Sequence, residues 1–391
     1  MNSAERFDVV LQIRSGGFAG AAASPSVVLG RLEAALPLLP VSTIIMGWHT
    51  SPAVYQAVAR YLRGSGIALY LWLPVFSEIG LLAPGRPVVG PDGTTARNYH
   101  LSDDENFEFY CPNDPANTTN LLAVFERYFA PLGFDGVFLD KIRYPSFVNG
   151  PAGGLTCFCP YCREIYAREG IDPTALQTRI EELPRHTTPF GVTAYQNGKY
   201  SFRDELWGHF FNLRQRLVYD RLSSICHTLR GQSYKIGLDV FAPFMSQFVG
   251  QDIPRLSTLA DFIKPMMYAT TSAPAGLPFE LAALLRETGT EPGRGEYCRL
   301  LGLDQTRKPF DLDFTAAEMN SLAGACACPV YPGIELNYVP GVAEPGPAYI
   351  ESALRAYNAA AGVVLCWDLL AMPPENIRAA GDFLGKSRPG N

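Results

Sequence analysis

The sequence predicts an α/β fold: a (β/α)8 TIM barrel in which the whole chain, 1–391, forms a single domain. Three observations predict it. Eight short apolar runs recur along the chain, helical patterns lie between them, and the runs reach a polar residue at or near their C-terminal ends. Parallel strands read as apolar runs because helices cover both faces of their sheet. Roughly 250 residues suffice for one such barrel, so the length does not require a second domain.

The first half of the predicted barrel consists of short runs rich in Val, Ile, Leu and Phe, separated by helical patterns. Short apolar runs of this kind favour buried strands, whereas helices need longer periodic segments. The four strands are Phe7–Arg14, Ser42–His49, Ile67–Val75 and Gly136–Ile142. The helices between them are Pro25–Leu39, Pro52–Arg63 and Thr119–Phe129.

The second half repeats the alternation, and its apolar runs each contain an acidic residue. The four strands are Lys235–Phe241, Asp261–Tyr268, Pro329–Asn337 and Gly362–Asp368. The helices expected around them are Arg203–Leu229, Phe279–Thr288, Thr315–Ala325 and Ala348–Ala361. A doubly wound open sheet is the competing fold, but no Gly-x-Gly-x-x-Gly loop follows the first strand, where Gly16 and Gly17 form only a turn.

Composition narrows the functional classes. Hydrophobic residues make up 47% of the chain and charged residues 18%, which is typical of a soluble globular protein. The formal net charge is −6 and no Lys/Arg-rich run occurs, so nucleic acid is not an expected partner. We expect no membrane association and a cytoplasmic location, because neither a long apolar span nor a signal peptide is evident at the start. The composition is compatible with a homo-oligomer.

Two segments are too long for ordinary connections, and they direct attention to one end of the barrel. They are Phe76–Asn117 after the third strand and Arg143–Ser201 after the fourth. Both are expected to emerge at the C-terminal face of the barrel, where long loops after strands build active sites.

A cysteine pattern lies in these same segments. Cys157, Cys159 and Cys162 form Cys-x-Cys-x-x-Cys, and Cys111 lies 46 positions before Cys157. Such close cysteines are poorly placed for disulfides with one another, whereas four thiolates suit a tetrahedral zinc ion. Free cysteines, or a disulfide from Cys111 to one of the three, are the alternatives. Four thiolates would fill the coordination sphere, so the predicted Zn2+ is structural and the region of about 143–201 is a zinc-binding insertion.

Two resemblances follow from these motifs. The segment from Cys157 to Asp172, with its earlier cysteine partner, resembles the zinc site of glycoside hydrolase family 42 β-galactosidases. The strand segment Phe134–Pro145 is similar to uncharacterised glycoside-hydrolase-like barrels with Phe-Asp-Gly and Asp-x-Ile-Arg-Tyr-Pro. Those barrels also carry Gly-Gln-Asp, here 250–252, before a Pro-Met-x-Tyr strand, here 265–268. The resemblance implies hydrolysis of a glycosidic bond and a carbohydrate substrate.

Acidic residues at strand ends fit that implied activity, because glycoside hydrolysis uses two carboxyl groups beside one bond. The candidates are Asp140, Asp239, Glu335 and Asp368. We expect Asp140 to pair with Glu335 across the barrel. The alternative pairs Asp140 with Asp239 from the next strand, which resembles the α-amylase-like barrels. The family 42 enzymes would have Asn-Glu where this chain has Leu139-Asp140, and this speaks against β-galactosidase activity.

Further residues at or near strand ends are predicted to bind the substrate, since sugar rings stack on flat aromatic side chains. The aromatic candidates are Trp48, Trp72, Tyr144, Tyr268, Tyr338 and Trp367. The polar and charged candidates are Gln12, Arg14, His49, Arg143, Lys264, Asn337 and Asp368. Core packing is the structural alternative for each aromatic residue. A carbohydrate-binding barrel without catalysis and a metal-dependent hydrolase are the alternative functions.

Overall fold

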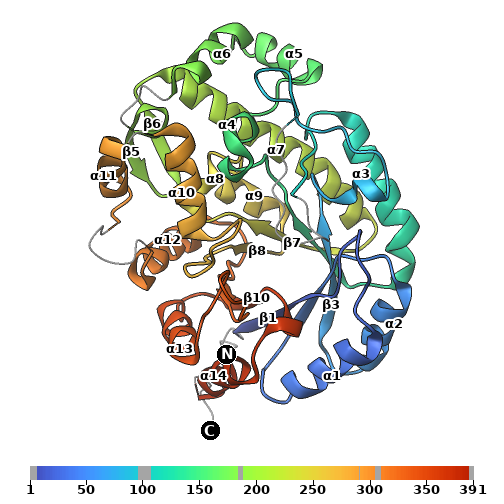
Figure 1. Ribbon diagram of the computed structural model, residues 1–391. Helices are drawn as coiled ribbons and strands as arrows, with labels where there is room; N and C mark the ends of the chain where they lie inside the picture. The colour runs from blue at the N-terminus through green and yellow to red at the C-terminus, as the bar shows by residue number, and fades with distance from the viewer. Residues whose placement is uncertain (1–6, 96–106, 184–187, 290, 304–309, 387–391) are drawn as a thin grey trace.

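The structure is a computed structural model that describes residues 7–95, 107–183, 188–289, 291–303 and 310–386. Its main sheet contains eight parallel strands (Figure 1). They are β1 (Asp8–Arg14), β2 (Thr43–Gly47), β3 (Ala68–Pro74), β4 (Gly136–Asp140), β7 (Lys235–Val240), β8 (Phe262–Pro265), β9 (Gly333–Glu335) and β10 (Gly362–Cys366). Each predicted strand is present.

The sheet closes into a nearly complete barrel. Its strand order is β8-β7-β4-β3-β2-β1-β10-β9, and bridges of Ile263 with Val330 and of Met266 with Gly333 join the two edge strands. This closure confirms the (β/α)8 TIM barrel and excludes the open doubly wound sheet. The seventh strand is shorter than predicted. Pro329 and Pro332 lie within the predicted range, and proline lacks the N–H that a ladder requires.

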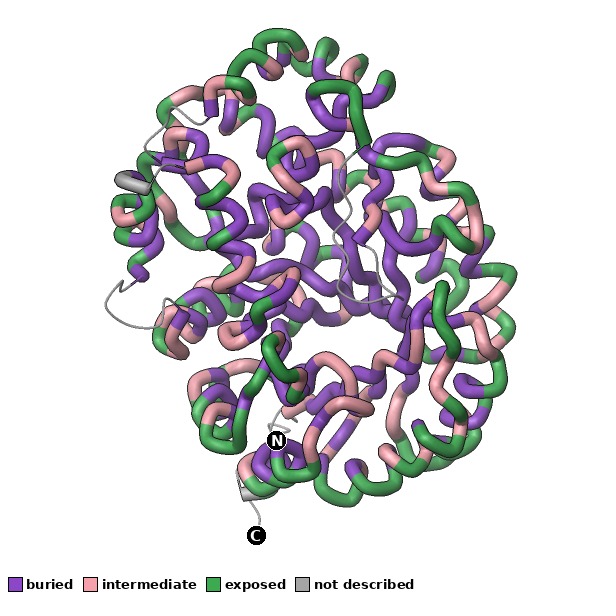
Figure 2. The backbone as a smooth tube through the Cα atoms, in the orientation of Figure 1, coloured by how far each residue is buried: buried purple, intermediate pink, exposed green. Residues whose placement is uncertain are grey.

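Helices surround the barrel (Figure 1) and cover the strands that lie buried at its centre (Figure 2). The main ones are α1 (Pro25–Ala35), α2 (Pro52–Tyr61), α3 (Pro115–Tyr128), α7 (Glu205–Gly231), α10 (Leu277–Thr288), α12 (Leu312–Ala325), α13 (Pro347–Ala356) and α14 (Pro374–Lys386). The α3 helix begins earlier than predicted because the Asp114 side chain accepts a hydrogen bond from the Ala116 N–H at its start. The final helix α14 is missing from the sequence prediction.

Within the described residues, both long connections contain short helical elements and β-bridges or strands. The connection after β3 contains η1 (Ile79–Leu81) and isolated bridges of Ser77 with Phe109 and of Pro87 with Tyr110. The segment after β4 contains a series of short elements. They are η3 (Phe147–Asn149), α4 (Gly150–Gly154), α5 (Pro160–Arg168), α6 (Pro173–Glu181), η5 (Pro189–Gly191) and the antiparallel hairpin of β5 (Val192–Gln196) and β6 (Lys199–Phe202).

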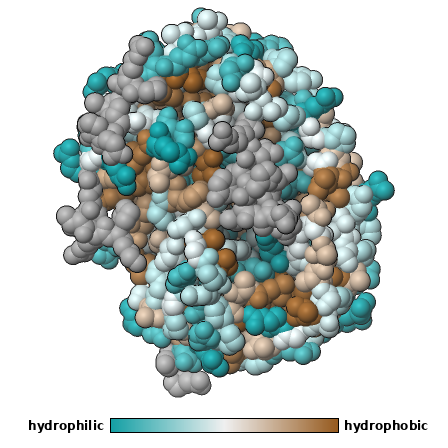
Figure 3. Space-filling model, viewed as in Figure 1, coloured by the Kyte–Doolittle hydropathy of each residue, from teal (hydrophilic) through white to brown (hydrophobic). Residues whose placement is uncertain are grey.

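The remaining helices and helical turns lie in the other connections. They are η2 (Ala130–Leu132), α8 (Pro243–Ser246), α9 (Ile253–Leu256), η6 (Ser257–Leu259), α11 (Glu291–Leu300) and η7 (Leu369–Ala371). No helix among the described residues is both long and apolar enough to cross a membrane. The face in Figure 3 mixes hydrophilic and hydrophobic residues, with hydrophilic atoms at much of its outer edge, as solvated outer faces of helices require.

Aromatic packing fills the barrel and joins the insertion to it. Inside the barrel, the Phe138 and Phe262 rings stack with centroids 5.9 Å apart. Beside the barrel, the ring centroid of Phe190 in η5 lies 4.9 Å from that of Trp207 in α7 and 5.3 Å from that of Phe248. The segment after β4 is therefore anchored on α7 by buried rings, which contribute stability through both area and geometry.

Gly136 begins β4 where the sheet leaves no room for a side chain. A Cβ atom there would lie 2.6 Å from the Tyr70 ring and 2.8 Å from the Lys235 carbonyl oxygen. We expect Gly136→Ala to lower the free energy of unfolding by about 1–3 kcal/mol, because overpacking forces neighbours to move. Gly30→Ala in α1 would meet no atom within 4 Å and should raise stability by roughly 0.5–1 kcal/mol. Urea unfolding measures both, and equal shifts would contradict the packing argument.

Candidate active site and cysteine cluster

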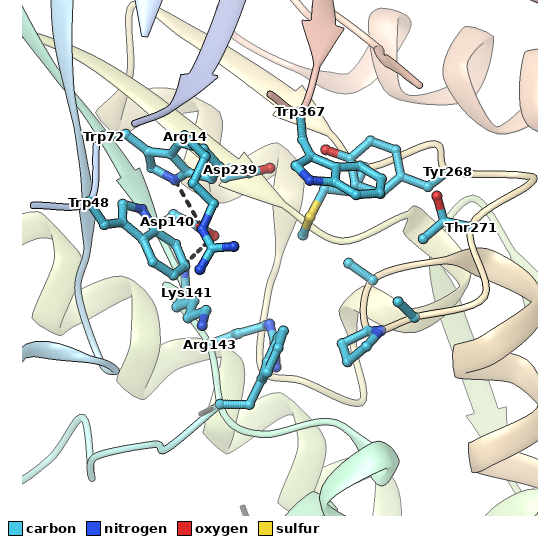
Figure 4. Close-up of a pocket in the computed structure, with 15 residues that line it drawn as sticks. Arg14, Trp48, Trp72, Asp140, Lys141, Arg143, Asp239, Tyr268, Thr271 and Trp367 are labelled. Atoms are coloured by element: carbon cyan, nitrogen blue, oxygen red, sulfur yellow. Dashed lines mark hydrogen bonds between the residues drawn. The ribbon is translucent and has the colours of Figure 1, made fainter. Parts of the chain in front are cut away.

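A pocket opens at the C-terminal ends of the barrel strands (Figure 4). Its wall combines charged side chains with aromatic rings. The lining residues are Arg14, Trp48, Trp72, Phe107, Asp140, Lys141, Arg143, Asp239, Met266, Tyr268, Thr271, Ala273, Pro274, Ala275 and Trp367. This is the end of a (β/α)8 barrel at which catalytic residues are found.

Asp140 is the last residue of β4 and lies in the pocket wall. Its Oδ2 accepts a hydrogen bond from the Trp72 indole N–H at 2.9 Å, and its Oδ1 accepts one from the Lys141 backbone N–H. The adjacent strand β3 supplies Trp72. Both oxygens therefore have fixed directions, and the carboxylate is oriented toward the pocket (Figure 4).

Asp239 lies on β7, the strand next to β4 in the barrel. Its Oδ2 accepts a hydrogen bond from Lys264 Nζ at 2.8 Å, while its buried Oδ1 has no hydrogen-bond partner among the described residues. Burial raises the pKa of Asp239 to about 7, the Lys264 charge lowers that pKa, and the Asp140 charge raises it. A carboxyl group with a pKa near neutrality can both release and accept a proton.

Lys264, which the sequence analysis predicts to bind substrate, does not line the pocket wall. Its side chain is fully buried, and its Nζ donates to Asp239, to the Tyr268 hydroxyl at 2.6 Å and to Gln12 Oε1 at 3.5 Å. Tyr268 itself lines the pocket, whereas Gln12 lies beneath it. Lys264 therefore neutralises and positions groups that face the pocket.

Glu335 is not brought together with Asp140. The Glu335 side chain is fully buried, does not line the pocket and already accepts four hydrogen bonds. Its Oε1 accepts from the backbone and hydroxyl of Thr270 and from the Thr271 hydroxyl, and its Oε2 accepts from Tyr349. The expected pairing across the barrel therefore does not fit the geometry, because Thr270, Thr271 and Tyr349 already donate to both oxygens of this buried carboxylate. Glu335 instead joins α13 to the loop that carries Thr271.

Several other predicted residues do lie together in the pocket. They are Arg14, Trp48, Trp72, Arg143, Tyr268 and Trp367. The Arg14 guanidinium lies 5.5 Å from the centroid of the Trp48 ring. The Arg143 guanidinium lies between the Phe109 and Phe241 rings, at 4.6 and 4.3 Å from their centroids. The contacts with these rings help to hold the two guanidinium groups in position.

His49 and Tyr144 are instead part of the core. The His49 ring shares a hydrogen bond with Ser15 at 2.9 Å and stacks on Tyr55, and burial lowers its pKa to about 4. Tyr144 is fully buried, and its hydroxyl accepts a hydrogen bond from Asn113. Neither side chain lines the pocket, so their predicted substrate contacts do not fit the geometry.

Three residues that follow the last two strands are also predicted to bind substrate, but they do not line the pocket. Asn337 is buried, and its Oδ1 accepts from the N–H groups of Trp367 and Asp368, so it positions Trp367 at the pocket. The Asp368 Oδ1 accepts from the Arg14 N–H at 3.1 Å and from Leu370 at the start of η7. Tyr338 is 48% exposed and lies outside the lining. These residues support the site or lie beside it.

Lys141 is a pocket residue that is not among the site residues predicted from the sequence. Its Nζ forms a buried ion pair with Glu78 at 2.7 Å and lies 4.5 Å from the centroid of the Trp48 ring. Both Lys141 and Glu78 have positive φ, at 50° and 61°. Non-glycine residues in this region are uncommon and concentrate at functional sites. Nothing in the local sequence signals this backbone conformation.

The four cysteines of the predicted metal site meet at one place. The Sγ atoms of Cys111, Cys157, Cys159 and Cys162 all lie within 4.8 Å of one another, and no disulfide links them. The Cys111 sulfur is 3.5 Å from that of Cys162 and 3.6 Å from that of Cys159. Cys157 also accepts a hydrogen bond from the Val89 N–H. This cluster is compatible with a metal ion held by four sulfur ligands, and no cysteine lines the pocket.

Comparison with known proteins supports the fold. No protein-family model matches the sequence, and no curated protein matches it significantly. Among solved structures, the chain is similar to the glycoside hydrolase domain of PgaB (BpsB) from Bordetella bronchiseptica, with a TM-score of 0.59 and 13% identity over 97% of this chain and 99% of that one.

Two further solved structures are similar to lesser degrees. An alpha-L-fucosidase isoenzyme 2 from Paenibacillus thiaminolyticus has a TM-score of 0.51 and 11% identity over 97% of this chain and 49% of that chain. A class V chitinase from Pseudomonas fluorescens Pf-5 has a TM-score of 0.50 and 10% identity over 96% and 99%. At these identities the likeness is one of fold, the (β/α)8 barrel.

The contact between Lys264 and Asp239 predicts how one titration responds to mutation. Lys264→Met should raise the pKa of Asp239 above 7, because the cation that favours the ionised carboxylate is removed while the burial is kept. Carbon-13 NMR titration of the aspartate carboxyl groups measures this pKa. Lys235→Met is the control, since Lys235 is exposed and faces Asp261. An unchanged or lowered pKa of Asp239 in Lys264→Met would contradict the assignment.

Proposed function

We propose that the protein is a glycoside hydrolase that cleaves a glycosidic bond in an oligosaccharide or polysaccharide. One observation carries the proposal: the pocket combines two carboxyl groups from neighbouring strands, Asp140 and Asp239, with three tryptophan rings. Two carboxyl groups beside one bond are what glycoside hydrolysis requires. Flat rings in the same wall suit the apolar faces of sugars. The fold of the similar structures, from enzymes of this class, agrees with it.

In this proposal the two aspartates have different roles because their surroundings differ. Asp239 has an unoccupied oxygen and a pKa of about 7, so it donates a proton to the glycosidic oxygen as the bond breaks. Asp140 accepts two hydrogen bonds from the protein and stabilises the positive charge that develops on the sugar ring. Asp239 gives its proton to the leaving oxygen of one product, water supplies the hydroxyl group of the other product, and the remaining proton of that water returns to Asp239.

The carboxyl roles are tested by isosteric substitutions. Asp140→Asn and Asp239→Asn should each lower turnover by roughly 10²–10⁴-fold, because an amide neither donates the proton nor carries the charge. Glu335→Gln is the matched control. It keeps an oxygen for Thr270 and Thr271, and its amide can donate to the Tyr349 hydroxyl, so it should retain most activity. Hydrolysis of an oligosaccharide library, with circular dichroism of each variant, measures the effect.

The outcomes of that experiment separate the rival functions. If Glu335→Gln folds but is inactive while Asp239→Asn is active, the second catalytic carboxyl group is that of Glu335 and not that of Asp239. Saturable binding of oligosaccharides by wild-type protein, without turnover of any of them, would indicate a carbohydrate-binding barrel and overturn the enzymatic proposal.

We also propose that the cysteine cluster holds one structural Zn2+. The site contains four sulfur ligands, which leave no open position for water or substrate, and it lies apart from the pocket wall. When bound, the ion would link the connection after β3, through Cys111, to the start of α5, through Cys159 and Cys162. A metal-dependent hydrolase is therefore not favoured.

Metal analysis tests this second proposal. Purified protein should contain about one zinc per chain, and Cys159→Ser should lower the melting temperature while leaving kcat nearly unchanged in the folded variant, since the ion joins two connections. Cys326→Ser is the control, because Cys326 lies outside the cluster. Loss of turnover without loss of stability would indicate a catalytic metal, and absence of stoichiometric zinc would contradict the site.

A further inference from the structure

Arg214 of α7 is a buried cation without a carboxylate partner. It has no exposed surface, and its Nη1 donates to the Phe248 carbonyl oxygen at 2.9 Å. Its Nε and Nη2 have no hydrogen-bond partner, and it forms no ion pair among the described residues. A charge removed from water in this way is unfavourable unless an opposite charge lies near it.

Two side chains connect Arg214 with the cysteine cluster. The guanidinium lies 4.2 Å from the centroid of the Tyr144 ring. The Asn113 amide group donates to the Tyr144 hydroxyl at 3.1 Å and to the Cys162 sulfur at 3.2 Å. One tyrosine ring and one amide thus separate the buried cation from a cysteine of the cluster.

Among the described residues that act on Arg214, the cysteines are the groups that can supply a negative charge. The hydroxyls of Tyr144 and Tyr166 are neutral at pH 7, because a phenol ordinarily loses its proton only near pH ~10. Aromatic faces attract a cation, but they carry no net charge. A divalent ion held by four thiolates has two net negative charges, and this is the charge that a neutral thiol cluster lacks.

We propose that Arg214 is the counter-charge of a metal centre formed by the four cysteines. The inference rests on the metal site proposed above and is independent of the glycosidase activity. Arg214 offsets half of the net charge of the centre, while Val89 N–H and the Asn113 amide group donate to individual sulfurs. Groups around metal ligands commonly change affinity in this way. The centre is thereby stabilised from the barrel helix α7 as well as from the two connections.

Zinc affinity tests the proposal. Competition with a chromophoric chelator should show that Arg214→Met binds zinc 10–100-fold more weakly than wild type, the range for loss of such a supporting group. Arg214→Lys keeps the charge and should lose less. Arg216→Met on the same helix is the control, because Arg216 is exposed and pairs with Glu169. Unchanged affinity in Arg214→Met overturns the proposal.

A charge-matched double variant covers the case in which Arg214→Met does not fold. Cys159→His replaces a thiolate with a neutral ligand, so Arg214→Met with Cys159→His restores the net charge of the wild-type centre. It should recover zinc affinity, or the yield of folded protein, relative to Arg214→Met alone. Failure to recover either would overturn the charge role in favour of packing. Absence of zinc from wild-type protein would instead refute the metal site itself.

Discussion

Closure of the eight-stranded parallel barrel is the constraint on which the rest of the structure depends. Parallel pairing in register places the C-terminal ends of β3, β4 and β7 side by side, so Trp72, Asp140 and Asp239 meet although long stretches of chain separate them. The same closure removes the polar edges that an open sheet would leave. Everything that faces the pocket therefore comes from one end of the barrel, and the long connections after β3 and β4 start there.

Burial and hydrogen bonding, rather than residue type, distinguish the acidic side chains at that end. Asp239 has one oxygen paired with Lys264 and one without a partner, so burial leaves its pKa near 7. Glu335 is equally buried, but Thr270, Thr271 and Tyr349 occupy both of its oxygens. A saturated carboxylate holds the loop beside the pocket, whereas an unsaturated one is available for chemistry.

The cysteine cluster joins the two long connections that follow β3 and β4. Cys111 comes from the segment after β3 and the other three cysteines come from the segment after β4, so their meeting joins two parts of the chain that the barrel does not hold directly. Nearby, Phe190 packs on α7 beside Trp207, and Arg214 of the same helix lies over Tyr144. Rings and sulfurs beside the pocket are continuous with the buried core of the barrel.

The sequence by itself determined the barrel, because buried parallel strands need continuous apolar runs, and all eight strands lie where such runs occur. It also predicted which cysteines meet, from the Cys-x-Cys-x-x-Cys spacing and from a fourth cysteine in the neighbouring long connection, and it predicted that Asp140 lies at a strand end. Only the tertiary structure decided that Asp239, and not Glu335, faces the pocket with Asp140, and that Lys264 and Asn337 support the site without lining it. The reason is physical: burial and hydrogen-bond saturation depend on donors such as Thr270 and Tyr349, which the fold brings from other elements.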